Sequence, residues 1–111
     1  MIKLAIDLGS SVTKIFRIGS GVVLAEPSCV AAASGTANIK AIGEEAKLLI
    51  GKTAEYTTIV FPVFEADIVN EEMAAIMLTY FLNKAGVTPK LARRAEAVFA
   101  VPCGAQDELL D

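Results

Sequence analysis

The chain has 111 residues, of which 54% are hydrophobic and 21% charged, and its formal charge is −3. This length supports one domain with one hydrophobic core, and the hydrophobic content excludes a disordered chain. The sequence contains no histidine and no basic cluster larger than Lys90, Arg93 and Arg94, which excludes a Ser-His-Asp triad and a His-ligated zinc site and argues against a nucleic-acid partner.

The N-terminal residues predict an antiparallel meander of three strands. Residues 2–8 and 12–18 are rich in β-formers and flank a small polar turn. A second turn, Gly19-Ser20-Gly21, precedes a third apolar run that Pro27 ends. The chain enters the first strand without the charged and apolar regions of a secretory signal, so we expect a cytoplasmic protein.

A small insertion is expected at roughly residues 29–60. Residues 29–33 and 39–42 have the composition of short strands, and residues 43–50 predict a short helix that a glycine closes. The strand expected at Ile59 then returns the chain to the main sheet, which we expect to be mixed and to contain the meander and a strand near the C-terminus.

The strongest helix signal runs from Asn70 to Gly86. Asn70 is a typical N-cap residue, two glutamates follow it at the positive end of the helix, and apolar residues recur at i, i+3, i+4, i+7 and i+8 from Met73. Alanine and leucine residues make the other sides apolar too. We therefore expect this helix to be buried against its own sheet and against a further surface, through which the chain self-associates.

The C-terminal part predicts one buried strand and the start of a helix. Residues 87–96 have the polar and basic character of a surface loop, and residues 97–101 form an uninterrupted apolar run of the kind buried inside a sheet. A helix is expected to begin near Asp107. Cys29 and Cys103 have no C-x-x-C spacing, which favours small buried hydrophobic side chains over reactive thiols.

The turn between the first two strands has the properties of a phosphate-binding loop. Asp7 ends the first strand, Gly9 allows close backbone approach, and Ser10 and Ser11 add hydroxyl and amide donors. Lys14 supplies a positive charge, and a carboxylate at the end of the strand can hold Mg²⁺ through water. An ordinary hairpin turn has the same spacing, because D-x-G-S is common in turns.

The same pattern resembles the first phosphate motif of the actin-like ATPases, a superfamily that includes the nucleotide domains of heat-shock chaperones and sugar kinases. That motif is a strand, D-x-G-[ST] and a second strand, and the residues that match it are Asp7, Gly9, Ser10 and Lys14. At Lys14 the chain is closer to actin, which has a phosphate-contacting lysine there, than to its bacterial relatives.

Later stretches narrow the resemblance to the bacterial MreB proteins. Residues 24–31 (LAEPSCVA) resemble the MreB segment N-E-P-S-V-V-A, and residues 41–47 (AIGEEAK) resemble A-V-G-E-E-A-K. Tyr80-Phe81 and Val101-Pro102-Cys103-Gly104 are similar to the MreB patterns L-x-Y-F and V-P-x-G. The similarity runs in register from residue 2 to about residue 108.

This resemblance implies an α/β fold of the ribonuclease H-like, actin-type kind, with residues 1–111 as a single N-terminal subdomain. It implies an ATP-binding cytoskeletal protein that polymerises into filaments guiding bacterial cell shape. The cofactors it implies are ATP and Mg²⁺, with the metal held through water by Asp7. The residues it places at the nucleotide phosphates are Gly9, Ser10, Ser11 and Lys14.

The resemblance also indicates where a catalytic group is expected. In MreB proteins the helix after V-P-x-G carries a glutamate that orients the attacking water, and Leu109 occupies that position here. Gln106 and Glu108 are the candidate substitutes. Adjacent positions on a helix point about 100° apart, so only a weak ATPase is expected, and only from a complete chain.

Several partners and alternatives follow from the same comparison. The MreB resemblance implies self-assembly, the inner-membrane surface and cell-wall synthesis proteins as partners. The basic residues Lys90, Arg93 and Arg94 either contact that membrane or a neighbouring subunit, or form a solvated loop. Two other functions stay open: an actin-superfamily ATPase of the chaperone-like or cell-division type, and a scaffold or binding fragment without nucleotide chemistry.

Overall fold

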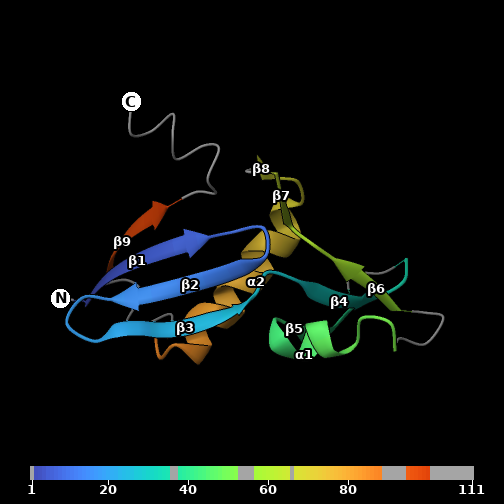
Figure 1. The fold of residues 1–111 in the computed structure, drawn as a ribbon, viewed down its shortest axis with the longest axis horizontal. Helices are drawn as coiled ribbons and strands as arrows, with labels where there is room; N and C mark the ends of the chain where they lie inside the picture. The colour runs from blue at the N-terminus through green and yellow to red at the C-terminus, as the bar shows by residue number, and fades with distance from the viewer. Residues whose placement is uncertain (1, 36–37, 53–56, 66, 89–94, 101–111) are drawn as a thin grey trace.

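The N-terminal meander and the last strand form one four-stranded sheet. β1 (Ile2–Leu8), β2 (Val12–Arg17) and β3 (Gly21–Pro27) are antiparallel neighbours, and β9 (Ala95–Ala100) pairs in parallel with β1, in the order β3-β2-β1-β9 (Figure 1). This mixed sheet confirms the expected meander and the expected strand near the C-terminus, which stands at one end of the described strand order and pairs with β1. The computed structural model describes residues 2–35, 38–52, 57–65, 67–88 and 95–100.

A second sheet of three strands lies beside the first. It contains β4 (Val30–Ala33), β5 (Ile39–Ile42) and β6 (Thr57–Val60) in the order β5-β4-β6, with α1 (Glu44–Leu48) following β5. The expectation that the strand at Ile59 joins the main sheet is wrong, because Ile59 pairs with Ala31 of β4. Both edges of β1 are already occupied by β2 and β9, whereas β4 offers a free edge opposite β5.

α2 (Glu71–Lys84) begins at the expected N-cap. The Asn70 Oδ1 atom accepts a hydrogen bond from the Met73 N–H at 3.0 Å, which satisfies one of the unpaired donors of the first turn. The helix runs behind the main sheet in Figure 1. Neither α2 nor α1, the helices within the described ranges, has the length and hydropathy that a membrane crossing requires.

One hydrophobic core joins α2 to both sheets. Alternate residues of the strands point towards the helix, as expected for sheets covered on one face. The buried cluster contains Leu4, Ile6, Leu8, Ile15 and Leu24 from the main sheet, Val30, Ala32 and Ile42 from the second, and Met73, Met77 and Phe81 from α2. A smaller cluster of Cys29, Ala31 and Ala46 lies between β4 and α1, so β4 is buried on both of its faces.

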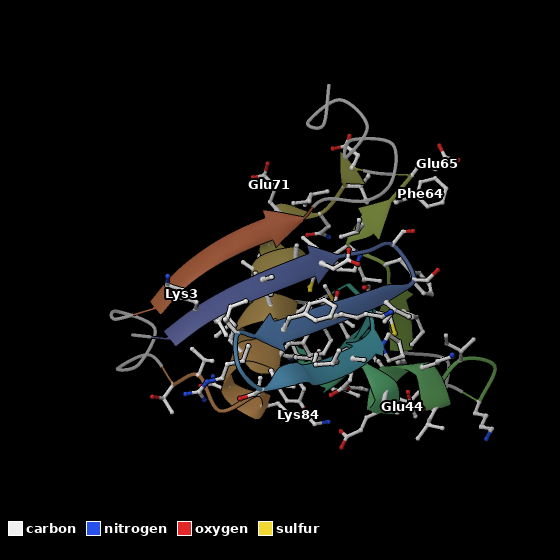
Figure 2. All side chains as sticks on the ribbon, turned by 60° about the vertical axis from the view of Figure 1, so that its left-hand side comes forward. Lys3, Glu44, Phe64, Glu65, Glu71 and Lys84 are labelled. Atoms are coloured by element: carbon white, nitrogen blue, oxygen red, sulfur yellow. The ribbon has the colours of Figure 1, made fainter. Side chains whose placement is uncertain are left out.

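A short hairpin precedes α2 and was not expected from the sequence. β7 (Val63–Phe64) and β8 (Asp67–Ile68) pair in an antiparallel manner, and Glu65 at the tip has a φ of 47° (Figure 2). The Pro62 carbonyl accepts hydrogen bonds from the N–H groups of Val69 and Asn70 at 2.9 and 3.3 Å. Strands of two residues are too short to produce a periodic sequence signal.

A buried carboxylate connects β3 of the main sheet to both helices, α1 and α2. Glu26 of β3 is only 7% exposed, and its Oε2 atom lies 2.7 Å from Lys84 Nζ at the end of α2. Its Oε1 atom accepts a hydrogen bond from the Glu44 N–H in the first turn of α1 at 3.0 Å. Figure 2 shows Glu44 and Lys84 at the same end of the molecule. One side chain therefore links three elements that are separate in the sequence.

The C-terminal strand begins earlier than expected. β9 starts at Ala95, which pairs with Ile2 of β1, so the expected loop over residues 87–96 is shorter. Parallel pairing with β1 from Ile2 to Asp7 extends the strand beyond its most apolar residues, because each added pair completes backbone hydrogen bonds.

We predict that Gly43→Ala destabilises the chain by about 2–4 kcal/mol. Gly43 has a φ of 69°, and an added Cβ would lie 2.8 Å from the Phe81 ring and even closer to Glu26 Oε1. The matched control is Gly51→Ala, because Gly51 also has a positive φ (77°) but has open space around it. This control retains only the backbone strain, about 1–2 kcal/mol. Urea unfolding measures the free energy of unfolding of both variants. An equal loss of stability in Gly43→Ala and Gly51→Ala would show that the contacts of Gly43 with Phe81 and Glu26 do not matter.

Candidate functional site

The turn between β1 and β2 is closed by a single backbone hydrogen bond. The Gly9 N–H donates to the Val12 carbonyl at 3.1 Å. A Cβ atom at Gly9 would lie 2.5 Å from the same carbonyl oxygen, so this closure requires glycine. The backbone of the turn is therefore held in place while its side-chain-bearing residues, Ser10 and Ser11, lie between the two strands.

The backbone N–H groups of Ser10 and Ser11 lie outside the sheet ladder. β1 ends at Leu8 and β2 begins at Val12, and within the described part of the chain no hydrogen bond uses either N–H group. Ser10 is half-buried and Ser11 is exposed. Two adjacent amide donors and two hydroxyl groups are thus available to an acceptor at this turn.

Asp7 and Lys14 are direct cross-strand neighbours at the same end of the sheet. They pair in the register of β1 and β2, on the face opposite the buried side chains of Ile6 and Ile15. Asp7 is half-buried and Lys14 is exposed. The described residues include no ion pair between them, so the carboxylate and the ammonium group are both available to a ligand.

A buried hydroxyl pair supports the turn from the core side. Thr13 Oγ1 and Ser28 Oγ are 2.7 Å apart, and the Ser28 N–H donates to the Ser11 carbonyl at 2.9 Å. These contacts tie the turn to the segment between β3 and β4. Ser28 was not predicted from the sequence to have this role, although it lies within the MreB-like residues 24–31.

Cys29 lies next to this pair and is buried, which confirms its expected role as a small hydrophobic side chain. It is 1% exposed, and its Sγ atom donates to the Gly43 carbonyl at 3.5 Å. Burial raises the pKa of the thiol above its ordinary value of 9.0, and the negative charge of Glu44 acts in the same direction, while the Lys47 ammonium opposes them.

A cavity of about 240 Å³ lies between the turn and the second sheet. Ser10 and Ser11 line it from the turn, Ser28 and Cys29 from the segment before β4, and Lys47 from α1. Lys47 was not among the site residues predicted from the sequence, although the A-I-G-E-E-A-K stretch contains it. Lys47 reaches this cavity because the tertiary structure brings α1 close to the turn, and no spacing of residues along the sequence indicates this.

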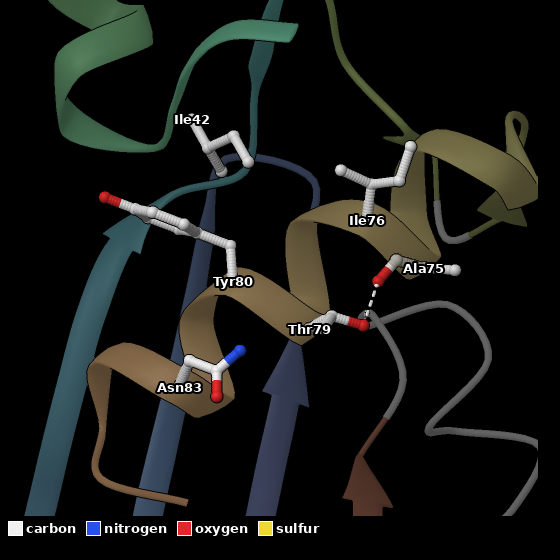
Figure 3. Close-up of a pocket in the computed structure, with 6 residues that line it drawn as sticks. All are labelled: Ile42, Ala75, Ile76, Thr79, Tyr80 and Asn83. Carbon is white, nitrogen blue, oxygen red and sulfur yellow. Dashed lines mark hydrogen bonds between the residues drawn. The ribbon is translucent and has the colours of Figure 1, made fainter. Parts of the chain in front are cut away.

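A second surface hollow lies along α2. It has a volume of about 380 Å³ and is lined by Ile42, Ala75, Ile76, Thr79, Tyr80 and Asn83 (Figure 3). The Thr79 hydroxyl donates to the Ala75 carbonyl at 2.8 Å, so its polar atom is turned back onto the helix. The exposed surface of this side of α2 is therefore largely apolar.

No group of three or more cysteine, aspartate or glutamate side chains in the described ranges could enclose a metal ion. Asp7 is the carboxylate beside the turn, and one carboxylate is enough for Mg²⁺ when water and ligand phosphates complete its coordination. The candidate catalytic residues Gln106 and Glu108 lie outside the described residues. So do the basic residues Lys90, Arg93 and Arg94, and Cys103.

The sequence places the chain in a family. A family model described as MreB/Mbl protein matches residues 1–108. The chain belongs to the MreB/Mbl family. It is 38% identical over 84 residues to cell shape-determining protein Mbl of Bacillus cereus, covering 76% of this chain and 25% of that protein. It is 32% identical over 106 residues to cell shape-determining protein MreB of Pasteurella multocida, covering 92% of this chain and 30% of that protein.

Solved structures of the MreB/Mbl family have the same fold. The chain superposes on MreB5 of Spiroplasma citri bound to ADP with a TM-score of 0.78 and 28% identity, over 98% of this chain and 33% of that one. The AMPPNP-bound form gives a TM-score of 0.81 and 27% identity, with the same coverage. The MamK double helical filament gives 0.65 at 23% identity, over 98% and 36%, a likeness of fold alone. The actin-type fold is confirmed, and the chain spans about a quarter to a third of its relatives.

We predict that the stability of this MreB/Mbl chain falls above pH 9 in a way that depends on Cys29. Because the folded chain keeps the thiol neutral more strongly than the unfolded chain does, this contribution is complete below the unfolded-state pKa. It is lost as the pH rises through the folded-state pKa. Urea unfolding of Cys29→Ala in parallel isolates the effect, and an equally steep loss in both proteins would contradict it.

Proposed function

We propose that this chain is the phosphate-binding part of an actin-like cell shape protein that binds ATP and polymerises. The observation that carries the proposal is the open turn between β1 and β2, where the Ser10 and Ser11 amides are not used by the sheet. Support comes from the relatives, two of which are named cell shape-determining proteins, and from the MreB5 structures, which are bound to ADP and AMPPNP.

In this proposal the turn binds nucleotide phosphates through several weak contacts. Gly9 lets the backbone approach the phosphate closely, and Ser10 and Ser11 donate from their amide and hydroxyl groups. Lys14 neutralises phosphate charge from the neighbouring strand. Each charge-assisted hydrogen bond is stronger than a neutral one, but exposure to water reduces the benefit.

Asp7 is the proposed site for Mg²⁺. Its carboxylate lies beside Lys14 on the open face of the sheet, where it can accept hydrogen bonds from metal-bound water. The metal would neutralise phosphate charge. The protein's contribution at this point is to hold one carboxylate at the end of a strand, next to the turn.

We assign water activation to Glu108 or Gln106, with Leu109 at the position that carries a glutamate in MreB proteins. A carboxylate or amide displaced along a helix orients water poorly. We therefore propose that the complete protein is a weak ATPase and that this activity requires the rest of the fold. The further proposed properties are a cytoplasmic location, contact with the inner membrane and with cell-wall synthesis proteins, and an insertion subdomain over residues 29–60.

We predict that Mg-ATP binds this chain no more tightly than about 1 mM, close to −4 kcal/mol, because the turn supplies only one side of a nucleotide site. ¹⁵N NMR titration should move the amide signals of residues 9–14 first. Lys14→Ala should weaken binding about fivefold through the loss of one partly screened charge contact.

The matched control for this titration is Lys3→Ala. Lys3 is exposed and lies on β1, on the same face as Asp7 but at the opposite end, so the variant has the same change in net charge. If Lys3→Ala weakens Mg-ATP binding as much as Lys14→Ala does, the effect of Lys14→Ala comes only from the change in net charge. Signals that do not move at residues 9–14 would exclude the nucleotide function and favour a scaffold without nucleotide chemistry.

We predict that the apolar hollow on α2 supports self-association. Ala75→Glu places a charge in this hollow without disturbing the buried face of the helix, because Ala75 is exposed. Sedimentation velocity should show oligomers of the unaltered chain that dissociate in Ala75→Glu. Ser20→Glu, in the exposed turn between β2 and β3, adds the same charge elsewhere. A monomeric unaltered chain at high concentration would refute this prediction.

A further inference from the structure

The cavity beside the phosphate turn is the place where the second sheet approaches the proposed ligand. Its walls combine Ser10 and Ser11 of the turn with Lys47 of α1, and it also includes Ile50 and Phe61. A ligand at the turn therefore contacts residues from both parts of the molecule. Nothing in the proposed roles of residues 7–14 uses the wall that α1 provides.

The charge of this cavity favours an anion. Lys47 is the charged side chain among the lining residues, which otherwise carry hydroxyl, thiol and apolar groups. The described part of the chain contains no salt bridge to Lys47. Within the described residues its ammonium group is therefore not paired with a carboxylate, and no carboxylate in the lining opposes an anion.

The position of α1 is set by contacts to the main sheet and to the segment before β4. The Gly43 N–H donates to the Cys29 carbonyl at 2.8 Å, and the Glu44 N–H donates to Glu26 Oε1 at 3.0 Å. The Lys47 N–H donates to the Gly43 carbonyl at 2.9 Å. These bonds place Lys47 one turn beyond the anchored end of α1.

Lys47 and Cys29 both line this cavity. The Lys47 ammonium lowers the pKa of the Cys29 thiol against the larger effect of burial. The lysine side chain is exposed and has a flexible four-carbon stem with three rotatable donors, so it can move its charge towards the turn.

We propose that Lys47 is a second cation for the phosphate chain of the bound nucleotide. It reaches across the cavity from α1 to the terminal phosphate at the Ser10–Ser11 turn, and so connects the second sheet to the nucleotide. This inference rests on the proposed nucleotide function. It assigns to Lys47 a preference for longer phosphate chains, because only a chain that extends past the turn into the cavity meets this ammonium group.

Inorganic tripolyphosphate and orthophosphate test the proposal in the 111-residue chain. ¹⁵N NMR titrations of the unaltered chain should show tripolyphosphate shifting residues 9–14 and also residues 47–50. Lys47→Ala should weaken tripolyphosphate binding about threefold to tenfold, with a smaller effect on orthophosphate, and added salt should reduce the difference. Lys47→Arg should restore most of the affinity.

Lys40→Ala is the control, because Lys40 is exposed on β5 and does not line the cavity. If Lys47→Ala weakens tripolyphosphate binding no more than Lys40→Ala, the role of Lys47 is overturned while the phosphate turn stands. If neither phosphate shifts residues 9–14 in the unaltered chain, the proposed function and the role of Lys47 both fall. Well-dispersed amide spectra of each variant establish that the fold is retained.

Discussion

The buried carboxylate of Glu26 is the contact on which the arrangement of the molecule depends. A carboxylate taken out of water is costly unless it is paired and hydrogen-bonded. Glu26 meets this requirement with partners from two distant elements, Lys84 at the end of α2 and the Glu44 N–H at the start of α1. The hydrogen bond to Glu26 also holds the pKa of the Lys84 ammonium above its ordinary value. The carboxylate therefore ties the start of α1, which follows β5 of the second sheet, to β3 and to the end of α2.

The contacts around the start of α1 also form the surroundings of the turn between β1 and β2. Cys29 and Gly43 exchange contacts at the boundary between β4 and α1, and Ser28 connects the same boundary to Thr13 and Ser11. The turn is therefore supported from below by polar contacts that use none of its own amide donors. The hydrogen bonds that order the turn, including the Gly9 N–H to Val12 carbonyl bond, leave the Ser10 and Ser11 amide donors available to the proposed anion.

The two faces of the main sheet have different roles. The face towards α2 is filled by a core that continues into the second sheet, which makes the chain one packed unit. The opposite face carries Asp7 and Lys14 at one end and Lys3 at the other. Because alternate residues of a strand point to opposite faces, the residues that pack the core and the residues proposed to bind the ligand are different residues of the same two strands.

The sequence by itself determined the local features of this MreB/Mbl chain. The meander, the N-cap at Asn70, the glycine-containing turn and the family resemblance all arise from residues close together in the chain, where turn chemistry and periodicity act directly. Only the tertiary structure decided that β6 pairs with β4, that Glu26 bonds to two helices and that Lys47 lines the cavity beside Ser10. Those outcomes depend on long-range strand pairing and on the pairing of a buried charge, and neither leaves a periodic signal in the sequence.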